Sequence, residues 1–566
     1  MFNRVLVANR GEVAVRVLRT LREMGISSVA VYSDADRDAP HVRMADSAYR
    51  LGPSPPRESY LNVARVLAAA RESGADAVHP GYGFLAENHH FARALLEAGI
   101  TFIGPPAAVI ERLRRKTTAR EIFAQSGVPI LPGTLDSPTS LAEFASAAER
   151  IGYPVIIKPA VGGGGKGLQV VNSPAQLAAG VQACAREAQS AFGESAIYLE
   201  KYLEHARHLE IQVLADRHGE MLQLFERECS IQRRHQKIVE ETPSPALTPT
   251  QRAELGAAAL RAMSAAGYVN AGTVEFLLDE RGRFYFLEVN SRLQMEHAIT
   301  ELTLGVDLVR KQIEIAAGRP LGLTQDSLAP RGHAIECRLY AETPARSFLP
   351  SPGTITHFAP AEGPFVRFEH ALRVGAHLPR DYDPILGKLV VWAENRPAAI
   401  ARMIRALEEN VLLGVETSTE LLIAIVGHDR FRAGAVHTQF IEDELTPFRS
   451  DELYSELAGA AYLVARGLER PGSGAPRASL EPHASAVPPS VARRESRQSS
   501  PRGGPPGKKP PRRCAGGEES AGRPAPSAWG LDATPKPGAG VSPGPWQTLA
   551  RFGRTHKSGK RLRRSQ

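Results

Sequence analysis

Two glutamates and one asparagine stand close together in a segment that could bind a metal ion. The segment NAGTVEFLLDERGRFYFLEVNSRLQMEH, residues 270–297, has the pattern of a β-hairpin. In the register that we predict, Glu275 lies opposite Phe286, so Glu275 and Glu288 are diagonal neighbours on one face, roughly 7–8 Å apart. Asn290 follows on that face, and such hard oxygen ligands suit Mg²⁺, which keeps positions open for phosphate. For either glutamate alone, a solvent-facing position is the alternative.

Three polar residues directly after this hairpin could handle a small carboxylate. Arg292, Gln294 and Glu296 alternate with Leu293 and Met295, so in an extended chain the polar three share one side. An arginine can clamp a planar carboxylate or bicarbonate in a fork, and a nearby glutamate can remove its proton. The spacing therefore indicates acid–base chemistry on a small anion.

A cationic segment upstream offers the charges that anionic substrates require. ECSIQRRHQKIVEE, residues 228–241, concentrates polar and basic side chains at Gln232, Arg233, Arg234, His235 and Lys237. Cations arranged around a site stabilise anionic substrates and transition states. A solvated surface face explains such a charge run equally well.

The glycine run KPAVGGGGKG, residues 158–167, is predicted to form a lid over phosphate. It lacks the spacing of the phosphate-binding loop G-x-x-x-x-G-K-[ST], and a strand rather than a helix follows it, which excludes the dinucleotide fingerprint. We predict a strand–loop–strand unit that 155–157 enter and 168–171 leave. Its backbone N–H groups can approach an anion, and its glycines allow it to move. A flexible surface turn is the alternative.

The segment YLEKYLEHARHLEIQV, residues 198–213, supplies an apolar strand, a connection and a second strand. The connection from Glu200 to Leu203 could hold an adenine ring, which needs an apolar segment with free backbone groups. His208 and Glu210 fall on one face of the second strand. Taken alone, a histidine in this position is more often structural than a ligand.

These segments need a scaffold, and the first 115 residues predict its first part. Residues 1–115 alternate short apolar runs with helical patterns, which predicts an open parallel α/β domain of Rossmann-like type. The ligand-binding edge of such a sheet lies at the carboxyl ends of its strands. Two loops fall at that edge, 8–12 and 79–88.

The rest of the chain predicts a second and third ordered domain and a tail. Residues 116–330 combine strands, glycine hairpins and two long helices, with a lid at about 132–203, and residues 331–447 are mainly β with a closing helix. A helical extension is expected at 448–470. Residues 471–566 are rich in Pro, Gly, Ser and Arg without apolar periodicity, so we expect them to be disordered.

The overall composition is that of a large globular protein. Its 566 residues are 43% hydrophobic, enough for several cores. No stretch approaches about 18 uninterrupted apolar residues, and the first strand begins too early for a signal peptide, so we expect a cytoplasmic protein. The four cysteines have no metal spacing and are expected to be free thiols. Residues 471–566 hold 18 Lys and Arg against 5 Asp and Glu, so the net charge of +8 belongs to the tail.

Ten ordered motifs then resemble one family. ANRGE, HPGYGFLAEN, IGYPVIIKP, GGGGKG, RHLEIQV, QRRHQK, EVNSRLQMEH, GHAIECRLYAE, FLPSPG and YDPILGKLVVW follow one another as in biotin carboxylases, which are ATP-grasp enzymes. The resemblance covers about residues 1–447. It implies an N-terminal biotin carboxylase domain, a central ATP-grasp domain with a mobile glycine lid, and a C-terminal biotin carboxylase domain.

The resemblance also implies residue roles. ATP would be bound by Lys116, Lys158, Gly164, Gly165, Glu200, Lys201, Tyr202, Leu203, His208, Gln232, His235 and Leu277. Mg²⁺ or Mn²⁺ would be held by Glu275, Glu288 and Asn290. Bicarbonate and biotin would be bound by Lys237, Arg292, Gln294, the Met295 backbone and Arg338. In this family the glutamate that corresponds to Glu296 deprotonates bicarbonate.

The implied reaction is the ATP-dependent carboxylation of biotin through carboxyphosphate, the first half-reaction of acetyl-CoA or another acyl-CoA carboxylase and thus a step toward fatty acid biosynthesis. No Met-Lys-Met biotin-attachment motif occurs in the sequence, so biotin is expected on a carrier protein, with a carboxyltransferase as a further partner. The family also implies a homodimer. The helix expected at 452–467 resembles the stretch after the carboxylase in long α subunits of acyl-CoA carboxylases, which continue to a biotinyl domain.

Two alternatives stay open. Another ATP-grasp ligase would share the ATP and metal residues but would not need Lys237, Arg292, Glu296 and Arg338 together. An inactive scaffold could instead bind nucleic acid through its basic tail, in which case binding would weaken steeply with salt. The composition of 471–566 is also that of GC-rich DNA translated out of frame, and we hypothesise such an origin.

Overall fold

The computed structural model describes residues 1–162, 165, 167–448 and 462. The chain divides into one compact unit, Met1–Ala461 with Gly544–Gln566, and a second, Tyr462–Pro543. The described residues belong to the first unit, apart from Tyr462. Gly164 and the predictions for the helical extension and the tail lie outside the described residues, apart from Phe448 and Tyr462.

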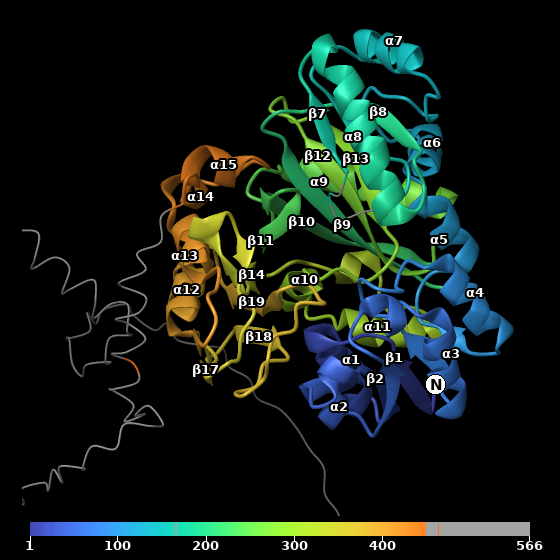
Figure 1. Ribbon diagram of the computed structural model, residues 1–566, viewed down its shortest axis with the longest axis vertical. Coiled ribbons are helices and arrows are strands. Elements are labelled where there is room, and N and C mark those ends of the chain that lie inside the picture. The colour runs from blue at the N-terminus through green and yellow to red at the C-terminus, as the bar shows by residue number, and fades with distance from the viewer. Residues whose placement is uncertain (163–164, 166, 449–461, 463–566) are drawn as a thin grey trace, which may run out of the picture. The chain divides into compact units, whose positions relative to one another are not determined.

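The N-terminal part is the predicted parallel α/β domain (blue in Figure 1). Its five strands run in the order β3-β2-β1-β4-β5, and every pair is parallel. The strands are β1 (Arg4–Val7), β2 (Ser27–Ser33), β3 (Ser47–Gly52), β4 (Ala77–His79) and β5 (Thr101–Phe102). The helices are α1 (Gly11–Glu23), α2 (Pro40–Met44), α3 (Val63–Glu72), α4 (His89–Glu97) and α5 (Ala107–Arg114). The next helix, α6 (Lys116–Gln125), packs instead in the core beneath the second sheet of the structure.

Alternation along β1 explains how this sheet is covered on both faces. Val5 and Val7 join a core with α1 and with α11 (Leu308–Ala316). Leu6 and Ala8 join a different core with α3, α4 and α5. Because successive strand residues face opposite sides, one short apolar run serves both layers.

A second, antiparallel sheet of eight strands positions most of the site (green to yellow in Figure 1). Its order is β13-β12-β9-β10-β11-β14-β19-β18, so it runs without a break through the predicted boundary between the second and third domains. The strands are β9 (Arg207–Ala215), β10 (Met221–Arg233), β11 (Gln236–Thr242), β12 (Asn270–Leu278), β13 (Phe284–Asn290), β14 (His333–Tyr340), β18 (Val366–His370) and β19 (Ile385–Ala393).

Helix α9 (Pro249–Ala265) covers one face of this sheet. A capping box of Thr248 and Gln251 begins the helix. Its buried residues pack with Leu209 and Ile211 of β9 and with Val274 of β12. The alternate residues of the same strands therefore face the other side, where the polar side chains of the site lie.

The predicted lid is a separate three-stranded sheet, ordered β7-β6-β8, with two helices (teal in Figure 1). Its elements are α7 (Leu141–Ile151), β6 (Val155–Pro159), β7 (Gln169–Val171), α8 (Pro174–Phe192) and β8 (Ile197–Lys201). Strands β6 and β7 are antiparallel neighbours, which confirms the strand–loop–strand arrangement around the glycine run.

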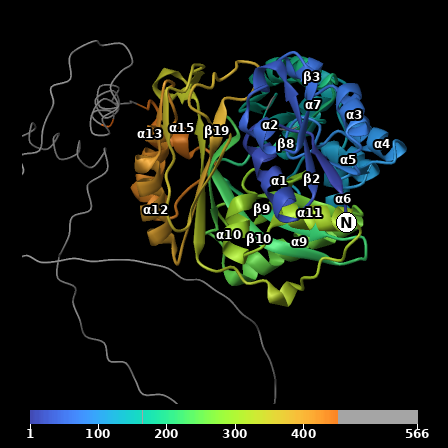
Figure 2. The ribbon, with the colours of Figure 1, turned by 90° about the horizontal axis from the view of Figure 1, so that it is seen from below.

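The C-terminal part covers the other end of the eight-stranded sheet. Helices α12 (Arg396–Glu409) and α13 (Thr419–Gly427) form a core with alternate residues of β14 and β19 (Figure 2). On the opposite face of these strands, Ala334 and Val390 pack against α10 (His297–Leu304). The remaining elements are β15 (Glu342–Thr343), β16 (Leu349–Pro350), β17 (His357–Ala359), β20 (Val411–Leu413), α14 (Asp429–Arg432), α15 (Phe440–Leu445) and four 3₁₀ turns, Asp34–Asp36, Pro56–Glu58, Gln325–Ser327 and Pro344–Arg346.

Two expectations from composition can be compared with these elements. Cys184, Cys229 and Cys337 are buried free thiols, as predicted, whereas Cys514 lies outside the described residues. Among the helices that the structure describes, none has the length and apolar character needed to span a bilayer.

Candidate active site

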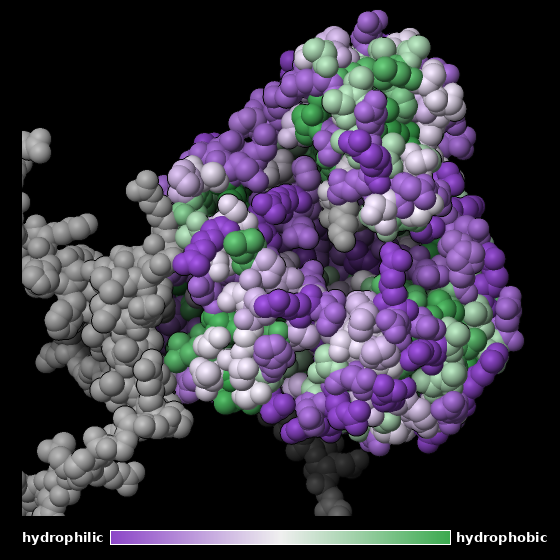
Figure 3. All heavy atoms as spheres, viewed as in Figure 1, coloured by the Kyte–Doolittle hydropathy of each residue, from purple (hydrophilic) through white to green (hydrophobic). Residues whose placement is uncertain are grey.

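A cavity of about 530 Å³ lies between the eight-stranded sheet and the lid sheet. Figure 3 shows the hollow there, bordered by hydrophilic residues. Eighteen of the predicted site residues line this cavity: Lys116, Lys158, Gly165, Lys201, Tyr202, Leu203, His208, Gln232, His235, Lys237, Glu275, Leu277, Glu288, Asn290, Arg292, Gln294, Met295 and Arg338. The structure thus gathers residues that are more than 200 positions apart in the sequence.

Glu200 and Glu296 are predicted site residues that do not line the cavity; both are fully buried behind residues that do. Glu200 forms ion pairs with Lys158 and with Arg120, which is itself fully buried. Although burial alone would raise it, the pKa of Glu200 is lowered by Lys158 and Arg120. The side chain of Glu200 therefore holds Lys158 in place.

The predicted pairing of the metal-binding hairpin is wrong by a small shift with a clear cause. Glu275 lies directly opposite Glu288, not diagonal to it, and Phe286 pairs with Phe276. The register shifts between these two pairs, so Leu287 is an extra residue on β13. This β-bulge brings the two glutamates closer than the regular register would.

Both glutamates carry counter-charges in this structure. Glu288 pairs with Lys116. Glu275 accepts a hydrogen bond from Asn290 Nδ2 at 2.7 Å and lies 2.9 Å from His208 Nε2. Burial raises the pKa of Glu275, but Lys237 and His208 outweigh it and hold this pKa far below its usual range. The carboxylate is therefore ionised and suited to a cation.

Lys237 connects the predicted metal ligands to the predicted acid–base residue Glu296. Its Nζ lies 2.7 Å from Glu275 Oε1 and 2.7 Å from Glu296 Oε1, and it also pairs with Glu210. Burial alone would favour the neutral amine, but these three carboxylates hold the pKa of Lys237 well above its ordinary value. The lysine is thus a fixed positive charge at the wall of the cavity.

Glu296 lies between two of the predicted bicarbonate-binding residues, Lys237 and Arg338. Besides its ion pair with Lys237, Glu296 accepts a hydrogen bond from Arg338 Nη2 at 3.0 Å. Arg338 Nε also donates to Glu240 at 2.6 Å, so the guanidinium lies between two carboxylates. Burial would raise the pKa of Glu296, yet Lys237 and Arg338 hold it well below its usual value, and Glu296 is ionised.

Arg292 is oriented by three side-chain acceptors. It donates to Asn290 Oδ1 at 2.9 Å and Gln294 Oε1 at 3.0 Å, and its Nε lies 3.1 Å from Glu87. Glu87 belongs to the 79–88 loop, which was expected at the ligand edge of the first sheet. The N-terminal domain therefore contributes directly to the position of the arginine fork.

Gly165 marks where the lid meets the sheet. Its φ is +71°, and a Cβ at this position would lie only 2.7 Å from the Cβ of His235. His235 itself has a φ of 63° at the turn between β10 and β11. Only glycine permits both the conformation and this close approach.

Several contributors to the site were not predicted. They are Glu87, Arg120, Glu210, Glu240 and Lys388, whose Nζ donates to the carbonyl oxygen of Met295. The sequence offers a hint of Glu210, because it lies two residues after His208 and so on the same face of one strand. The others are partners of predicted residues across strands or domains, and spacing along the chain gives no signal for such contacts.

Family models match three consecutive parts of the chain. "Biotin carboxylase, N-terminal domain" matches residues 1–110, "Carbamoyl-phosphate synthase L chain, ATP binding domain" matches 115–324, and "Biotin carboxylase C-terminal domain" matches 336–443. Biotin carboxylase 1 of Bacillus subtilis is 47% identical over 443 residues, which is 78% of this chain and 98% of that protein.

The chain belongs to the biotin carboxylase family. Its members are ATP-dependent ligases, and this chain has their three-domain fold. One of the pyruvate carboxylase subunits of Methanothermobacter thermautotrophicus is 48% identical, over 78% of this chain and 90% of that one. The biotin carboxylase domain dimer of Hydrogenobacter thermophilus 2-oxoglutarate carboxylase, solved with MgADP, ADP and bicarbonate, has a TM-score of 0.77 at 45% identity, over 78% of this chain and 98% of that one.

Proposed function

We propose that this protein uses ATP and bicarbonate to carboxylate biotin carried by another chain. The observation that supports the proposal best is the group formed by Lys237, Glu296 and Arg338. It places an ionised carboxylate between two cations beside the predicted metal ligands. A ligase that only needed ATP and metal would have no use for this group.

The nucleotide would lie between the lid and the sheet, with its phosphates toward Lys116 and Lys158. Both lysines line the cavity, and each has one carboxylate partner that fixes its position. The carboxylates of Glu275 and Glu288 and the amide of Asn290 fit Mg²⁺ or Mn²⁺, because all three lie together at the cavity wall and the first is ionised. When bound, the metal would neutralise phosphate charge.

Bicarbonate would lie against Arg292 and Lys237, with Glu296 as its proton acceptor. The substrate's negative charge offsets part of the positive charge that holds the pKa of Glu296 low, so the carboxylate becomes more basic as the substrate binds. The freed oxygen attacks the γ-phosphate of ATP, the bond to the bridging oxygen breaks, and carboxyphosphate and ADP are formed. A closed lid excludes water from this short-lived acyl phosphate.

The second step would transfer CO₂ to biotin. Carboxyphosphate releases CO₂ and phosphate, and phosphate takes the proton of the biotin ureido nitrogen. Arg338 would stabilise the enolate-like oxygen that develops, because its guanidinium stands at the cavity wall and burial between Glu240 and Glu296 fixes its orientation.

Partners and context are also part of the proposal. A biotin carrier protein and a carboxyltransferase would complete the reaction, and a homodimer is supported by the dimer of the Hydrogenobacter domain. We propose a cytoplasmic location. An acyl-CoA carboxylase with a role in fatty acid biosynthesis is one context, but relatives named for pyruvate and 2-oxoglutarate carboxylases support other acceptors equally.

The test is bicarbonate-dependent ATP hydrolysis, measured with and without free biotin, in the wild type, Glu296→Ala and Arg338→Ala. We expect biotin to stimulate hydrolysis and both substitutions to lower the rate at least about 100-fold. Arg283→Ala is the matched control, since its exposed side chain pairs only with Asp279 among the described residues. A Mg²⁺-dependent ATPase that biotin does not affect would instead favour another ATP-grasp ligase.

The scaffold alternative needs a different measurement. Its basic tail lies outside the described residues, so nothing in the structure bears on it. If deletion of 471–566 left carboxylation intact and abolished nucleic-acid binding, the tail would have a separate role. If the deletion changed neither, the tail would have no part in either activity.

A further inference from the structure

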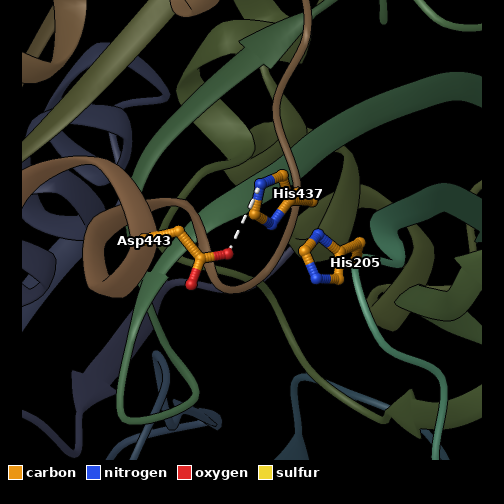
Figure 4. Close-up of side chains that lie close together, drawn as sticks. All are labelled: His205, His437 and Asp443. Atoms are coloured by element: carbon orange, nitrogen blue, oxygen red, sulfur yellow. Dashed lines mark ion pairs between the residues drawn. The ribbon is translucent and has the colours of Figure 1, made fainter.

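A second group of possible metal ligands lies outside the active-site residues. His205 belongs to the connection between β8 and β9, His437 precedes α15, and Asp443 lies within α15 (Figure 4). One ligand atom from each of the three side chains lies within 4.8 Å of the other two. The function proposed above uses none of these residues.

The distances suit an ion better than a direct hydrogen bond. His437 Nε2 lies 3.9 Å from Asp443 Oδ2, which is too long for a hydrogen bond. Two ligands that each stand about 2.1 Å from a tetrahedral zinc ion lie about 3.4 Å apart, so a shift of roughly 0.5 Å would bring these two atoms onto one ion. The rings of His205 and His437 lie face to face at a tilt of 33°, with centroids 4.7 Å apart. Figure 4 shows Asp443 and His205 on either side of the His437 ring.

The ligand atoms have no competing partners in the described part of the chain. His437 is 5% exposed, yet its Nδ1 has no hydrogen-bond partner there. Among the same residues, its Nε2 forms an ion pair only with Asp443. No lysine or arginine within the described ranges forms an ion pair with Asp443, although Arg430 on α14 pairs with the neighbouring Glu444. Neither ring nitrogen of His437 is therefore engaged in a hydrogen bond within these residues, and Nε2, which faces Asp443, is available to an ion.

The surroundings favour a cation. Asp443 stands in an acidic run with Glu442 and Glu444 on α15. Two imidazoles and one carboxylate form a ligand set that zinc and similar ions prefer over Mg²⁺.

We propose that His205, His437 and Asp443 bind one divalent transition-metal ion of the zinc class. Three protein ligands leave the fourth position to water. His205 and Asp443 are exposed and can rotate onto the ion, while the buried His437 provides the fixed anchor. The site needs no substrate and does not depend on the function proposed above.

The ion would fasten the connection between β8 and β9 to the segment before α15. Two hydrogen bonds already join them: Thr438 N donates to Ala206 O at 2.9 Å, and His205 N donates to Gln439 Oε1 at 3.1 Å. Ala206, Thr438 and Gln439 also line the large cavity. The metal would thus stabilise the wall of the cavity next to the base of the lid.

The test is zinc binding by the full chain after dialysis against a chelator. Zn²⁺ is titrated against a chromophoric competitor in excess Mg²⁺, which saturates the oxygen ligands at Glu275 and Glu288. We expect one equivalent to bind tightly in the wild type. His205→Ala and Asp443→Asn should each weaken that equivalent at least about tenfold. Because both side chains are exposed, these variants should fold normally.

The matched control is His90→Ala. His90 is an exposed histidine whose ring lies tilted against that of His89, with centroids 3.9 Å apart, and Glu111 lies 3.7 Å from His89. This group is a second histidine pair beside a carboxylate, but its possible ligand atoms do not all lie close enough together to hold one metal ion. We expect His90→Ala to bind zinc as the wild type does.

Three results would overturn the proposal. The first is a wild-type protein that binds no zinc in excess Mg²⁺. The second is unchanged zinc affinity in both His205→Ala and Asp443→Asn. The third is an equal loss in His90→Ala, which would mean that exposed histidines bind zinc without a built site. Substitution with Co²⁺ adds a spectroscopic check, since a tetrahedral nitrogen and oxygen site gives visible absorption bands that His205→Ala should abolish.

Discussion

Two buried lysines, Lys237 on β11 and Lys388 on β19, stand in matching surroundings. Each lies among carboxylates that raise its pKa against the effect of burial. Lys237 pairs with Glu275 and Glu296, and Lys388 Nζ lies 3.0 Å from Glu369. The side chain of Lys237 is 11% exposed and lines the cavity, whereas that of Lys388 is 0% exposed and does not.

The two lysines meet through adjacent residues of one loop. Lys237 pairs with Glu296, while Lys388 donates to the carbonyl oxygen of Met295. The same chemistry therefore serves two purposes. A charged side chain that lines the cavity can act on a substrate. A charged side chain that does not line the cavity can only position the residues that do. Residue type and burial alone do not distinguish an active site; access from the cavity does.

Replacing Lys237 by Met should produce the largest change in activity. The substitution removes the cation that pairs with Glu296 and that we propose to bind bicarbonate, and it leaves Glu210, Glu275 and Glu296 to repel one another. We expect kcat for bicarbonate-dependent ATP hydrolysis to fall about 10²–10³-fold. The unfolding free energy should fall by only about 1–2 kcal/mol, because cavity water can solvate the carboxylates. Steady-state kinetics and urea unfolding measure the two effects.

Replacing Lys388 by Met should reverse the balance between activity and stability. Glu369 keeps Arg367 as a partner but loses its buried lysine, and no cavity water replaces the charge. We expect urea unfolding to show a loss of about 3–5 kcal/mol. Lys388→Arg, which keeps the charge, should recover part of it. An unfolding free energy equal to that of Lys237→Met would contradict the distinction between the two lysines.

The sequence predicts the residues that face the cavity near Lys237 better than the fully buried residues around Lys388. Along β9 and β12, polar residues alternate with apolar ones that pack under α9, so the face of His208 and Glu275 follows from the period of a strand. The same reasoning correctly placed the 79–88 loop at the edge of the first sheet, where Glu87 reaches Arg292.

Two features could not be predicted because they depend on contacts between distant strands. The bulge at Leu287 changes the pairing of Glu275, and nothing in the local alternation marks it. Lys388 stands in the apolar run ILGKLVVWA, where its role depends on Glu369 of β18 and Met295 of the loop before α10. Periodicity gives the face of a strand but not its neighbours.

Glu12 offers a pH-dependent test of the dry network around Lys388. Burial raises the pKa of Glu12 to about 7 although Lys388 lowers it. Between about pH 4.5 and 7 the folded protein therefore holds a proton that the unfolded chain has released, so stability falls as pH rises through this range. Glu12→Gln has no charge to lose in either state. We expect the wild type to lose about 2–3 kcal/mol more than Glu12→Gln across this window.

Urea unfolding at pH 5 and pH 8 measures this difference. Glu97→Gln, which removes an exposed carboxyl from α4, serves as the control and should follow the wild type. If the unfolding free energies of the wild type and Glu12→Gln changed equally between pH 5 and pH 8, water would reach Glu12 in solution. The dry network would then extend less far from Lys388 than its burial indicates.

The smallest effect should come from an ion pair that water already reaches, away from both the cavity and the buried network. Arg405 Nε lies 2.6 Å from Glu409 on α12, and the two side chains are 33% and 37% exposed. Water already solvates both charges, so Arg405→Ala should change the unfolding free energy by less than about 0.5 kcal/mol. A double-mutant cycle with Glu409→Gln isolates the pair. A coupling energy as large as the effect of Lys388→Met would show that pairing itself, rather than the exclusion of water, determines the stability of the buried networks.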